Sequence, residues 1–251
     1  MEPLKTDLSI FKGFNFEKSP VGVKFLFFKP DGIEQLDKQL PFCEMIKEAQ
    51  ERKSPFYFTK ENENCIGKFV LGMEELPLFV ATGQLGPRLK IYQEARANSK
   101  LYQYVPEFEK GKVNYVVYSP LDQLTFDPDL LILMTTISQA EVVLRAMSYS
   151  TGEIWEPKAA PALNCPWIYI HPYKNGKVNY TVTGLAFGSK AKQIFEEGWM
   201  LISIPYNWIP TIAQNLKEMD WVPEGFTDGR EGFMKREEGI LEELARMSQN
   251  P

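Results

Sequence analysis

A five-residue sequence that occurs twice sets the strongest constraint on how this chain folds. Gly-Lys-Val-Asn-Tyr stands at residues 111–115 and again at 176–180. After each copy the order of segments is the same: two apolar runs typical of strands, then an amphipathic segment typical of a helix. Such a shared order is the sign of an internal repeat. The sequence therefore predicts two pseudo-repeated halves that meet near residues 110–125.

Apolar periodicity predicts a protein of the α/β (α+β) class. From Val21 to Phe28 the residues alternate as in a largely buried strand, the run at 130–134 is apolar throughout, and the run at 200–204 is apolar except for Ser203. After Pro41, apolar residues recur at steps of three and four, which is typical of an amphipathic helix. We therefore expect a mixed β-sheet flanked by helices.

The predicted domain boundary falls near residue 225. Residues 1–224 predict a single α/β domain, whereas 225–251 begins with a polar, glycine-containing stretch typical of a linker. Over 234–247, Ile240 and Leu244 stand on one side of a charged helical pattern. This pattern predicts a C-terminal helical arm, which could join two copies of the chain into a homo-oligomer.

Local sequence predicts the setting of several candidate residues. Helical spacing over 87–101 predicts one helix there. Proline disfavours helical backbone at the residue before it, so Pro166 predicts an extended Cys165. We expect Cys165 and His171 to lie in a loop over 150–173.

Charge and hydropathy exclude several classes of partner. The formal net charge is −5, and lysine and arginine are not concentrated in any segment. Because nucleic-acid backbones are bound by concentrated positive charge, we expect no nucleic-acid partner. No apolar run approaches the roughly 20 residues that cross a bilayer, and the N-terminal residues lack an apolar leader segment, so we expect no membrane partner.

The cysteines indicate a reducing compartment and a candidate site. There are three, an odd number without a CxxC pair, which predicts a cytoplasmic protein rather than a secreted disulfide framework. Cys43, Cys65 and Cys165 come from separate segments, and three thiolates could bind zinc or three irons of an iron–sulfur cluster. Cysteine is also among the most buried residue types, so inert packing is the alternative.

Three further side chains are candidates for binding a cofactor or an anionic ligand. Lys24 shares a predicted strand face with apolar residues; desolvated there it would act as a nucleophile or anion anchor, and on a wet edge strand it would not. Arg88 could bind a carboxylate or phosphate through paired hydrogen bonds, or simply expose charge on a helix. His171, the single histidine, could move protons or be a fourth metal ligand, or lie on the polar surface.

A group of short motifs resembles a known family. They are Ser19-Pro20-Val21-Gly22-Val23-Lys24-Phe25, the helix with Cys43, Asn64-Cys65-Ile66-Gly67 followed by Leu71-Gly72, Ser119-Pro120-Leu121 ahead of Pro128-Asp129, and Cys165. Over about residues 14–216 the chain resembles the uncharacterised prokaryotic family called domain of unknown function 169, common in archaea and anaerobic bacteria. The resemblance implies that Lys24 and the three cysteines match positions where the family often has lysine and cysteines. It implies no settled activity, and residues 180–192 lack the aspartate and arginine expected near Gly188.

No phosphate-binding loop, dinucleotide fingerprint, metalloprotease motif or serine-hydrolase motif occurs. The candidate residues therefore leave three hypotheses. In the first, the three cysteines bind a metal, an iron–sulfur cluster or a metallocofactor that serves a redox partner, with Lys24 or His171 supporting the ligands. The alternative is an enzyme that acts on a small anionic metabolite. Its nucleophile would be Cys65 or Cys165, and its anion anchor Lys24 or Arg88. The third is a structural or assembly subunit with inert, buried cysteines.

Overall fold

A seven-stranded sheet forms the centre of the molecule in a computed structural model, which describes residues 1–249. Its strands are β1 (Val21–Leu26), β2 (Glu34–Gln35), β3 (Phe56–Phe58), β4 (Tyr115–Pro120), β5 (Leu130–Thr135), β6 (Asn179–Val182) and β7 (Met200–Pro205). They lie in the order β2-β3-β4-β1-β5-β7-β6. The pair β2 and β3 runs parallel, and each other neighbouring pair runs antiparallel.

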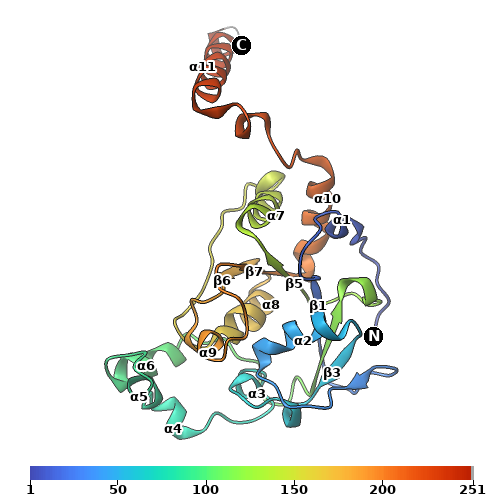
Figure 1. Cartoon of the computed structure of the whole chain (residues 1–251), viewed down its shortest axis with the longest axis vertical. Helices are drawn as coiled ribbons and strands as arrows, with labels where there is room; N and C mark the ends of the chain where they lie inside the picture. The colour runs from blue at the N-terminus through green and yellow to red at the C-terminus, as the bar shows by residue number, and fades with distance from the viewer. Residues whose placement is uncertain (250–251) are drawn as a thin grey trace.

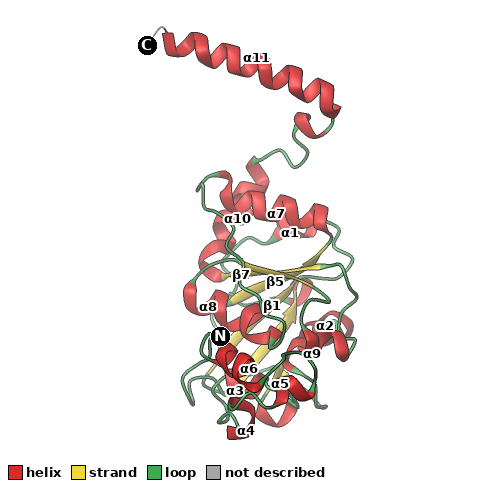
Figure 2. Cartoon of the chain, turned by 90° about the vertical axis from the view of Figure 1, so that its left-hand side faces the viewer, coloured by secondary structure: helices red, strands yellow, loops and turns green. Residues whose placement is uncertain are grey.

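Helices cover both faces of this sheet. They are α1 (Ser9–Lys12), α2 (Met45–Arg52), α3 (Gly67–Val70), α4 (Leu78–Ala81), α5 (Leu85–Arg88), α6 (Ala95–Tyr102), α7 (Ile137–Tyr149), α8 (His171–Asn175), α9 (Phe187–Ala191), α10 (Ile209–Glu218) and α11 (Gly229–Gln249). Short 3₁₀ turns are η1 (Phe42–Glu44), η2 (Lys60–Asn62), η3 (Leu121–Gln123), η5 (Tyr206–Trp208) and η6 (Glu224–Phe226), and η4 (Pro166–Ile170) is a π turn. Figures 1 and 2 show α1, α7 and α10 on one side of the sheet and α2 and α3 on the other. The predicted α/β (α+β) class with a mixed, helix-flanked sheet is confirmed.

Strand alternation divides the core between the two faces of the sheet. On β1, Val23 and Phe25 point to the face that packs against η1, α2 and η4. We call it the cysteine face, because Cys43 and Cys165 belong to its core. Lys24 points to the opposite side, the Lys24 face, which α1, α7 and α10 cover.

The two copies of the repeated pentapeptide open the same local turn but not equivalent units. Gly111 and Gly176 have φ of 74° and 60°, a left-handed conformation that glycine adopts readily, and a strand follows each. However, β6 pairs directly with β7, whereas β1 lies between β4 and β5. The strands β4 and β5 are thus parallel across β1, while β6 and β7 are antiparallel. The strand pairing does not support two pseudo-repeated halves.

The single helix expected over 87–101 is wrong, because two short helices, α5 and α6, stand there. Between them Lys90 has a φ of 58°, which ends the first helix. Gly86 lets the two helices pack closely, since a Cβ at this position would lie 2.7 Å from the Asn98 Cβ. Tertiary contact between the helices therefore overrides the local helical spacing.

Helix also replaces the loop expected around the third cysteine. Cys165 has helical backbone, with φ −55° and ψ −45°, directly before Pro166 in η4, and His171 begins α8. The expectation of an extended Cys165 in a loop is therefore wrong. Proline is tolerated in the first turn of a helix, where its missing N–H is not needed. The third cysteine is thus held by a regular element of the cysteine face.

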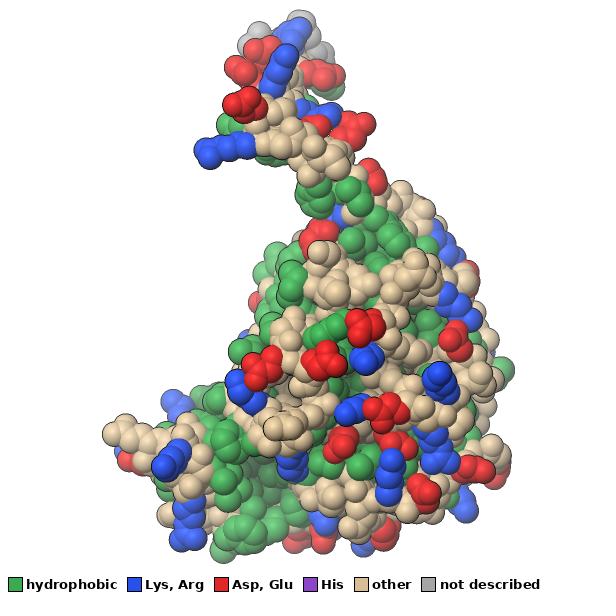
Figure 3. All heavy atoms as spheres, in the orientation of Figure 1, with side chains coloured by type: hydrophobic (Ala, Val, Ile, Leu, Met, Phe, Trp, Pro, Cys, Tyr) green, Lys and Arg blue, Asp and Glu red, His purple; other side chains and the backbone are tan. Residues whose placement is uncertain are grey.

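The expected C-terminal arm corresponds to η6 and α11, and residues 250–251 lie outside the described residues. Figures 1 and 2 show α11 projecting beyond α7 and α10, and Figure 3 shows acidic, basic and hydrophobic side chains along it. Arg145 of α7 holds the segment before the arm, because it donates to the backbone oxygens of Asp220 and Trp221 at 2.8 and 2.9 Å. Within residues 1–249, no helix is long and apolar enough to span a membrane.

Candidate thiol site

Aromatic stacking brings the segments of two cysteines together. Phe42, the neighbour of Cys43 in η1, stacks on Tyr169 of η4 with ring centroids 4.0 Å apart. The Tyr169 hydroxyl donates to the Phe42 carbonyl oxygen at 3.2 Å. Both Cys43 and Cys165 are buried. A hydrogen bond with Cys43, burial and nearby negative charge raise the pKa of Cys165, which is therefore a protonated thiol at neutral pH.

A buried carboxylate ties the Cys43 segment to the Cys65 segment. Glu63 is 2% exposed, and its two oxygens accept the backbone N–H groups of Phe42 at 3.0 Å and Lys68 at 3.1 Å. Burial raises the pKa of Glu63, and backbone hydrogen bonds, including one from Cys65, oppose that rise without cancelling it. One side chain thus fixes the turn that precedes α2 against the turn that precedes α3.

This clamp requires glycine at position 67. A Cβ on Gly67 would lie 2.3 Å from the Phe42 Cβ and 3.0 Å from the Glu63 Cδ. Packed atoms do not approach so closely, so a larger residue would push η1 away from α3. The Asn64-Cys65-Ile66-Gly67 motif therefore has a structural reason for its last residue.

Cys65 is partly exposed and has a lysine beside its sulfur. The Lys192 Nζ lies 3.1 Å from the Cys65 Sγ and links the segment after α9 to the loop before α3. Burial lowers the pKa of Lys192, but its hydrogen bond to Cys65 and the charges of all three cysteines outweigh this effect, and the net shift is upward. The Lys192 ammonium is therefore charged at pH 7 and lies directly beside Cys65.

A tyrosine hydroxyl in the same region has no partner. Tyr118 of β4 is fully buried, and no residue within 1–249 makes a hydrogen bond with its hydroxyl. Its ring lies 6.2 Å from that of Tyr169. Burial raises its pKa, the neighbouring Tyr169 hydroxyl lowers it in part, and Cys165, Cys43 and Glu63 have smaller effects. An unsatisfied buried hydroxyl costs about 1–3 kcal/mol, so a ligand or water beside it would be stabilised.

The donor set suits a soft metal, although the thiols are not arranged as a ready single-ion site. Three cysteine sulfurs favour zinc, copper(I) or iron–sulfur units. In the part of the chain that the structure describes, no three histidine, cysteine, aspartate or glutamate side chains are grouped so that they could hold a metal ion. A zinc ion draws its sulfur ligands to about 2.3 Å from one centre, whereas a four-iron cluster binds each sulfur at a different iron.

Lys24 is not brought to the cysteines. It lies on the opposite face of the sheet, where its Nζ is 2.9 Å from the Asp129 Oδ1. The other oxygen of Asp129 accepts the backbone N–H of Phe25 at 2.8 Å. This ion pair ties β1 to the start of β5, which is a structural role.

Arg88 and His171 also have surroundings other than the cysteines. Arg88 is exposed on α5, among the short helices at one edge of the molecule (Figure 1). The His171 Nδ1 lies 3.1 Å from the side-chain nitrogen of Asn175. Burial, and to a smaller extent Lys158 and Lys177, lower the pKa of His171, so its imidazole is neutral at pH 7.

Sequence reasoning missed Glu63, Tyr118 and Lys192. Glutamate is rarely buried, and nothing in a polar loop signals that distant backbone groups will cover Glu63. Lys192 is separated from Cys65 by 127 positions, beyond any local pattern. Tyr118 could have been found, because strand alternation places it on the same face as Val116.

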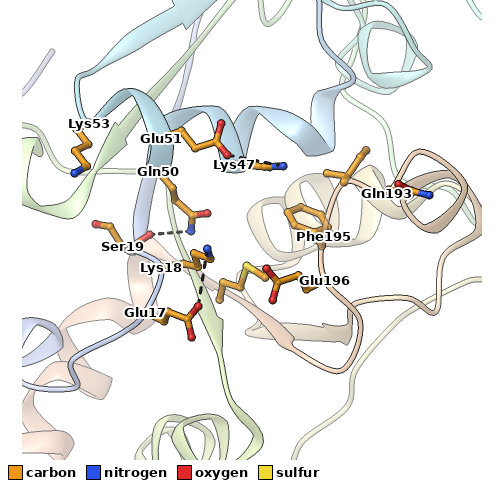
Figure 4. A pocket seen from close by; sticks show the side chains of 12 residues that line it. Glu17, Lys18, Ser19, Lys47, Gln50, Glu51, Lys53, Gln193, Phe195 and Glu196 are labelled. Atoms are coloured by element: carbon orange, nitrogen blue, oxygen red, sulfur yellow. Dashed lines mark hydrogen bonds and ion pairs between the residues drawn. The ribbon is translucent and has the colours of Figure 1, made fainter.

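The pocket in Figure 4 lies beside the thiol site and does not include the cysteines. It encloses about 500 Å³ between α2, residues 17–19 and residues 193–196, which follow Lys192. Three lysines and three glutamates line it, and Lys47 pairs with Glu51 at 3.8 Å. Because the charges are balanced, this pocket has no marked preference for an anion.

The fold and the site together define an α+β protein with two buried thiols and a phenol unpaired within residues 1–249 on one face of a mixed sheet, and with a buried carboxylate and a partly exposed thiol in the segment before α3. The model of the family called domain of unknown function 169, described as "Uncharacterised ArCR", matches residues 10–215. This match covers most of the chain, and the chain belongs to that family.

One curated relative is an uncharacterized protein of Methanocaldococcus jannaschii, MJ0308, which is 30% identical over 125 residues. The match covers 49% of this chain and 53% of the relative, so the chain spans about half the length of that protein. No solved structure matches the chain. Neither the description of the family nor that of the relative names an activity.

Proposed function

We propose that Cys43, Cys65 and Cys165 form one thiol site that binds a metallocofactor, best an iron–sulfur cluster. The observation that carries this proposal is that Cys43 and Cys165 belong to one core cluster, while Glu63 ties the segment of Cys65 to that of Cys43. The unpaired Tyr118 hydroxyl supports it, because a buried polar atom without a partner is stabilised by a ligand. A cluster would supply electron transfer, which implies a redox partner.

Each residue would have a distinct role in this site. Cys43 and Cys165 would supply buried ligands, and Cys65 the ligand nearest to solvent. Because ligating sulfurs must lose their protons, binding would strengthen as pH rises, above all through Cys165, whose pKa is raised. Lys192 would offset the negative charge of the bound sulfurs.

Anaerobic purification, followed by iron, zinc and sulfide analysis and an absorption spectrum, tests this proposal. Wild type should carry iron and sulfide, and Cys43→Ser, Cys65→Ser and Cys165→Ser should each lose most of both. Lys24→Met, which changes the opposite face, is the control and should keep them. A colourless, metal-free wild type after anaerobic reconstitution would overturn the proposal, as would unchanged metal content in the serine variants.

The contact between Lys192 and Cys65 favours a second candidate, an enzyme whose nucleophile is Cys65. An ammonium 3.1 Å from a partly exposed sulfur places a cation beside a side chain that can attack a substrate. Lys192 would then replace Lys24 and Arg88 as the anchor for a small anionic substrate. The buried, protonated Cys165 is poorly suited to attack a substrate.

Alkylation of Cys65 by a negative and a neutral reagent tests this second candidate. Iodoacetate should be favoured over iodoacetamide, relative to free cysteine, and Lys192→Met should remove the preference. Lys190→Met is a matched control, because Lys190 pairs with Glu197 at 3.0 Å instead. A preference that is unchanged in Lys192→Met would show that the lysine does not recruit anions.

A further inference from the structure

Two apolar surfaces of this chain have no partner within the described residues, and the first is on α11. Ile240, Leu244 and Met247 recur at helical steps of four and three, and each is at least half exposed. Figures 1 and 2 show this helix held away from the body. Gly232 and Gly239 lie inside it and weaken it as an isolated helix. Because helices gain most of their stability from packing, α11 is suited to lie against a partner.

The second surface is on the α4–α6 lobe, which we define as residues 78–104. Leu78 and Phe79 at the start of α4 are 80% and 68% exposed, and Leu85 and Leu89 are also exposed. Figure 3 shows hydrophobic side chains gathered at this edge of the molecule. Contiguous exposed apolar area on a folded protein marks an interaction site. The lobe therefore offers a surface on which an apolar helix face can dock.

The lobe and the middle of α11 carry opposite charge, with Lys235, Arg236 and Arg246 at the two ends of the acidic stretch. The lobe has one acidic residue, Glu94, and four exposed basic ones, Arg88, Lys90, Arg96 and Lys100. On α11, residues 237–243 contain four glutamates and no basic residue. An apolar centre flanked by complementary charge is the arrangement of a specific protein interface.

The two surfaces do not meet within one chain. Figures 1 and 2 show the α4–α6 lobe and α11 at opposite ends of the body. The hydrogen bonds from Arg145 to the backbone of Asp220 and Trp221 fix the start of the arm beside α7. The complementarity therefore selects a second copy of the same chain as the partner.

We propose that α11 of one copy docks on the α4–α6 lobe of a second copy. The apolar side of α11 would cover Leu78 and Phe79, and the glutamates of 237–243 would face the basic residues of the lobe. Arg88 would then bind carboxylates of the partner rather than a metabolite. In this proposal the exchange is mutual and closes into a two-fold dimer that uses both arms and both lobes; a contact that did not close would give an open chain of copies instead. This contact is independent of the thiol site.

Sedimentation velocity on the full chain over a range of concentrations tests the dimer. Wild type should have twice the chain mass of 28.9 kDa. Leu244→Asp on α11 and Phe79→Asp on the lobe should each raise the dissociation constant by about tenfold or more. All the changed side chains are exposed, so folding should persist, which circular dichroism checks. Ile154→Asp, at another exposed apolar residue, should leave the dimer intact.

Charge reversal tests which surfaces meet. Reversing Glu242 and Glu243 to lysine should weaken the dimer, and so should reversing Arg96 and Lys100 to glutamate. The two double changes together should restore it. A monomeric wild type at every concentration would overturn the proposal. So would a dimer that the α11 changes break and the lobe changes leave intact, because α11 would then pair with α11.

Discussion

The two faces of the sheet bury similar apolar strands but differ in how their polar groups are paired. On the Lys24 face, Lys24 and Asp129 pair at 2.9 Å, and the buried Asn215 donates to a backbone carbonyl at 2.7 Å. The buried side-chain atoms without a partner among residues 1–249 are the Tyr118 hydroxyl and the Trp167 indole nitrogen, which belong to the strand and π turn of the cysteine face. Complete pairing suits a structural face, and incomplete pairing suits a binding site. The Lys24 face therefore has a structural role, and the cysteine face holds the candidate site.

Gly67→Ala should give the largest effect on the cysteine face. Its Cβ would lie 2.3 Å from the Phe42 Cβ, and overpacking of this kind costs about 1–3 kcal/mol. We expect the upper end of this range, because an atom next to the backbone cannot easily move aside. Urea unfolding measures the change. Gly188→Ala, whose Cβ meets no atom within 4 Å, is the control, and an equal loss in both variants would contradict the clamp.

Glu63→Gln should release the Cys43 segment. The amide cannot accept both N–H groups that the carboxylate accepts, so unfolding free energy should fall by about 1–3 kcal/mol. Alkylation of Cys43, followed by mass spectrometry, should become faster. Glu48→Gln is the matched control, because Glu48 is also buried, at 8% exposed, but pairs with Lys38 instead of with backbone N–H groups near Cys43. Equally fast Cys43 alkylation in the control would show general loosening instead.

Glu63 also predicts a pH dependence of stability. Its folded pKa is raised above the ordinary value of 4.5, so the folded chain holds this proton more tightly than the unfolded chain. The resulting stabilisation is complete below pH 4.5 and is lost as pH rises through the raised folded pKa. The unfolding free energy of wild type, minus that of Glu63→Gln, should therefore decrease over this interval. A difference that stays constant with pH would contradict the burial of a titrating carboxyl.

Lys24→Met should have a smaller effect, confined to the other face. Loss of a half-buried ion pair lowers the free energy of unfolding by about 1 kcal/mol at most, and Asp129 keeps its backbone hydrogen bond from Phe25. The alkylation rates of the three cysteines should match those of wild type. A clear change in these rates would break the separation between the two faces.

Tyr118→Phe should give the smallest effect and the opposite sign. In cofactor-free protein the change removes an unpaired buried hydroxyl, so stability should rise by up to about 1 kcal/mol. Thermal unfolding of metal-free protein measures this. A clear loss of stability would mean that a bound water or another group already satisfies the hydroxyl.

The sequence predicted those features that depend on neighbouring residues. Alternation along Val21–Phe25 and the apolar runs at 130–134 and 200–204 gave the central strands, because period and burial are local properties. The helix around Cys165 was missed, since the rule for residues before proline is weaker than the helical context that tertiary packing supplies. The repeated pentapeptide correctly marked a glycine turn before a strand, but turns do not determine which strands pair.

The candidate site was only partly predictable from the sequence. The cysteine types suggested a shared site, yet the approach of their segments depends on the stacking of Phe42 on Tyr169 and on the hydrogen bonds of Glu63. Lys24 was an attractive candidate because a lysine among apolar residues is rare, but alternation along β1 sends it to the face opposite Cys43. Contacts between distant segments carry no signal in a single sequence.

The most direct test of a shared thiol site is native mass spectrometry of anaerobically prepared protein. Wild type should carry an added mass equal to one iron–sulfur cluster per chain. Cys43→Ser, Cys65→Ser and Cys165→Ser should each have the bare chain mass, because removal of one ligand opens the site. Bare chain mass in wild type, or the same added mass in all four proteins, would contradict the claim that the three cysteines act as one site.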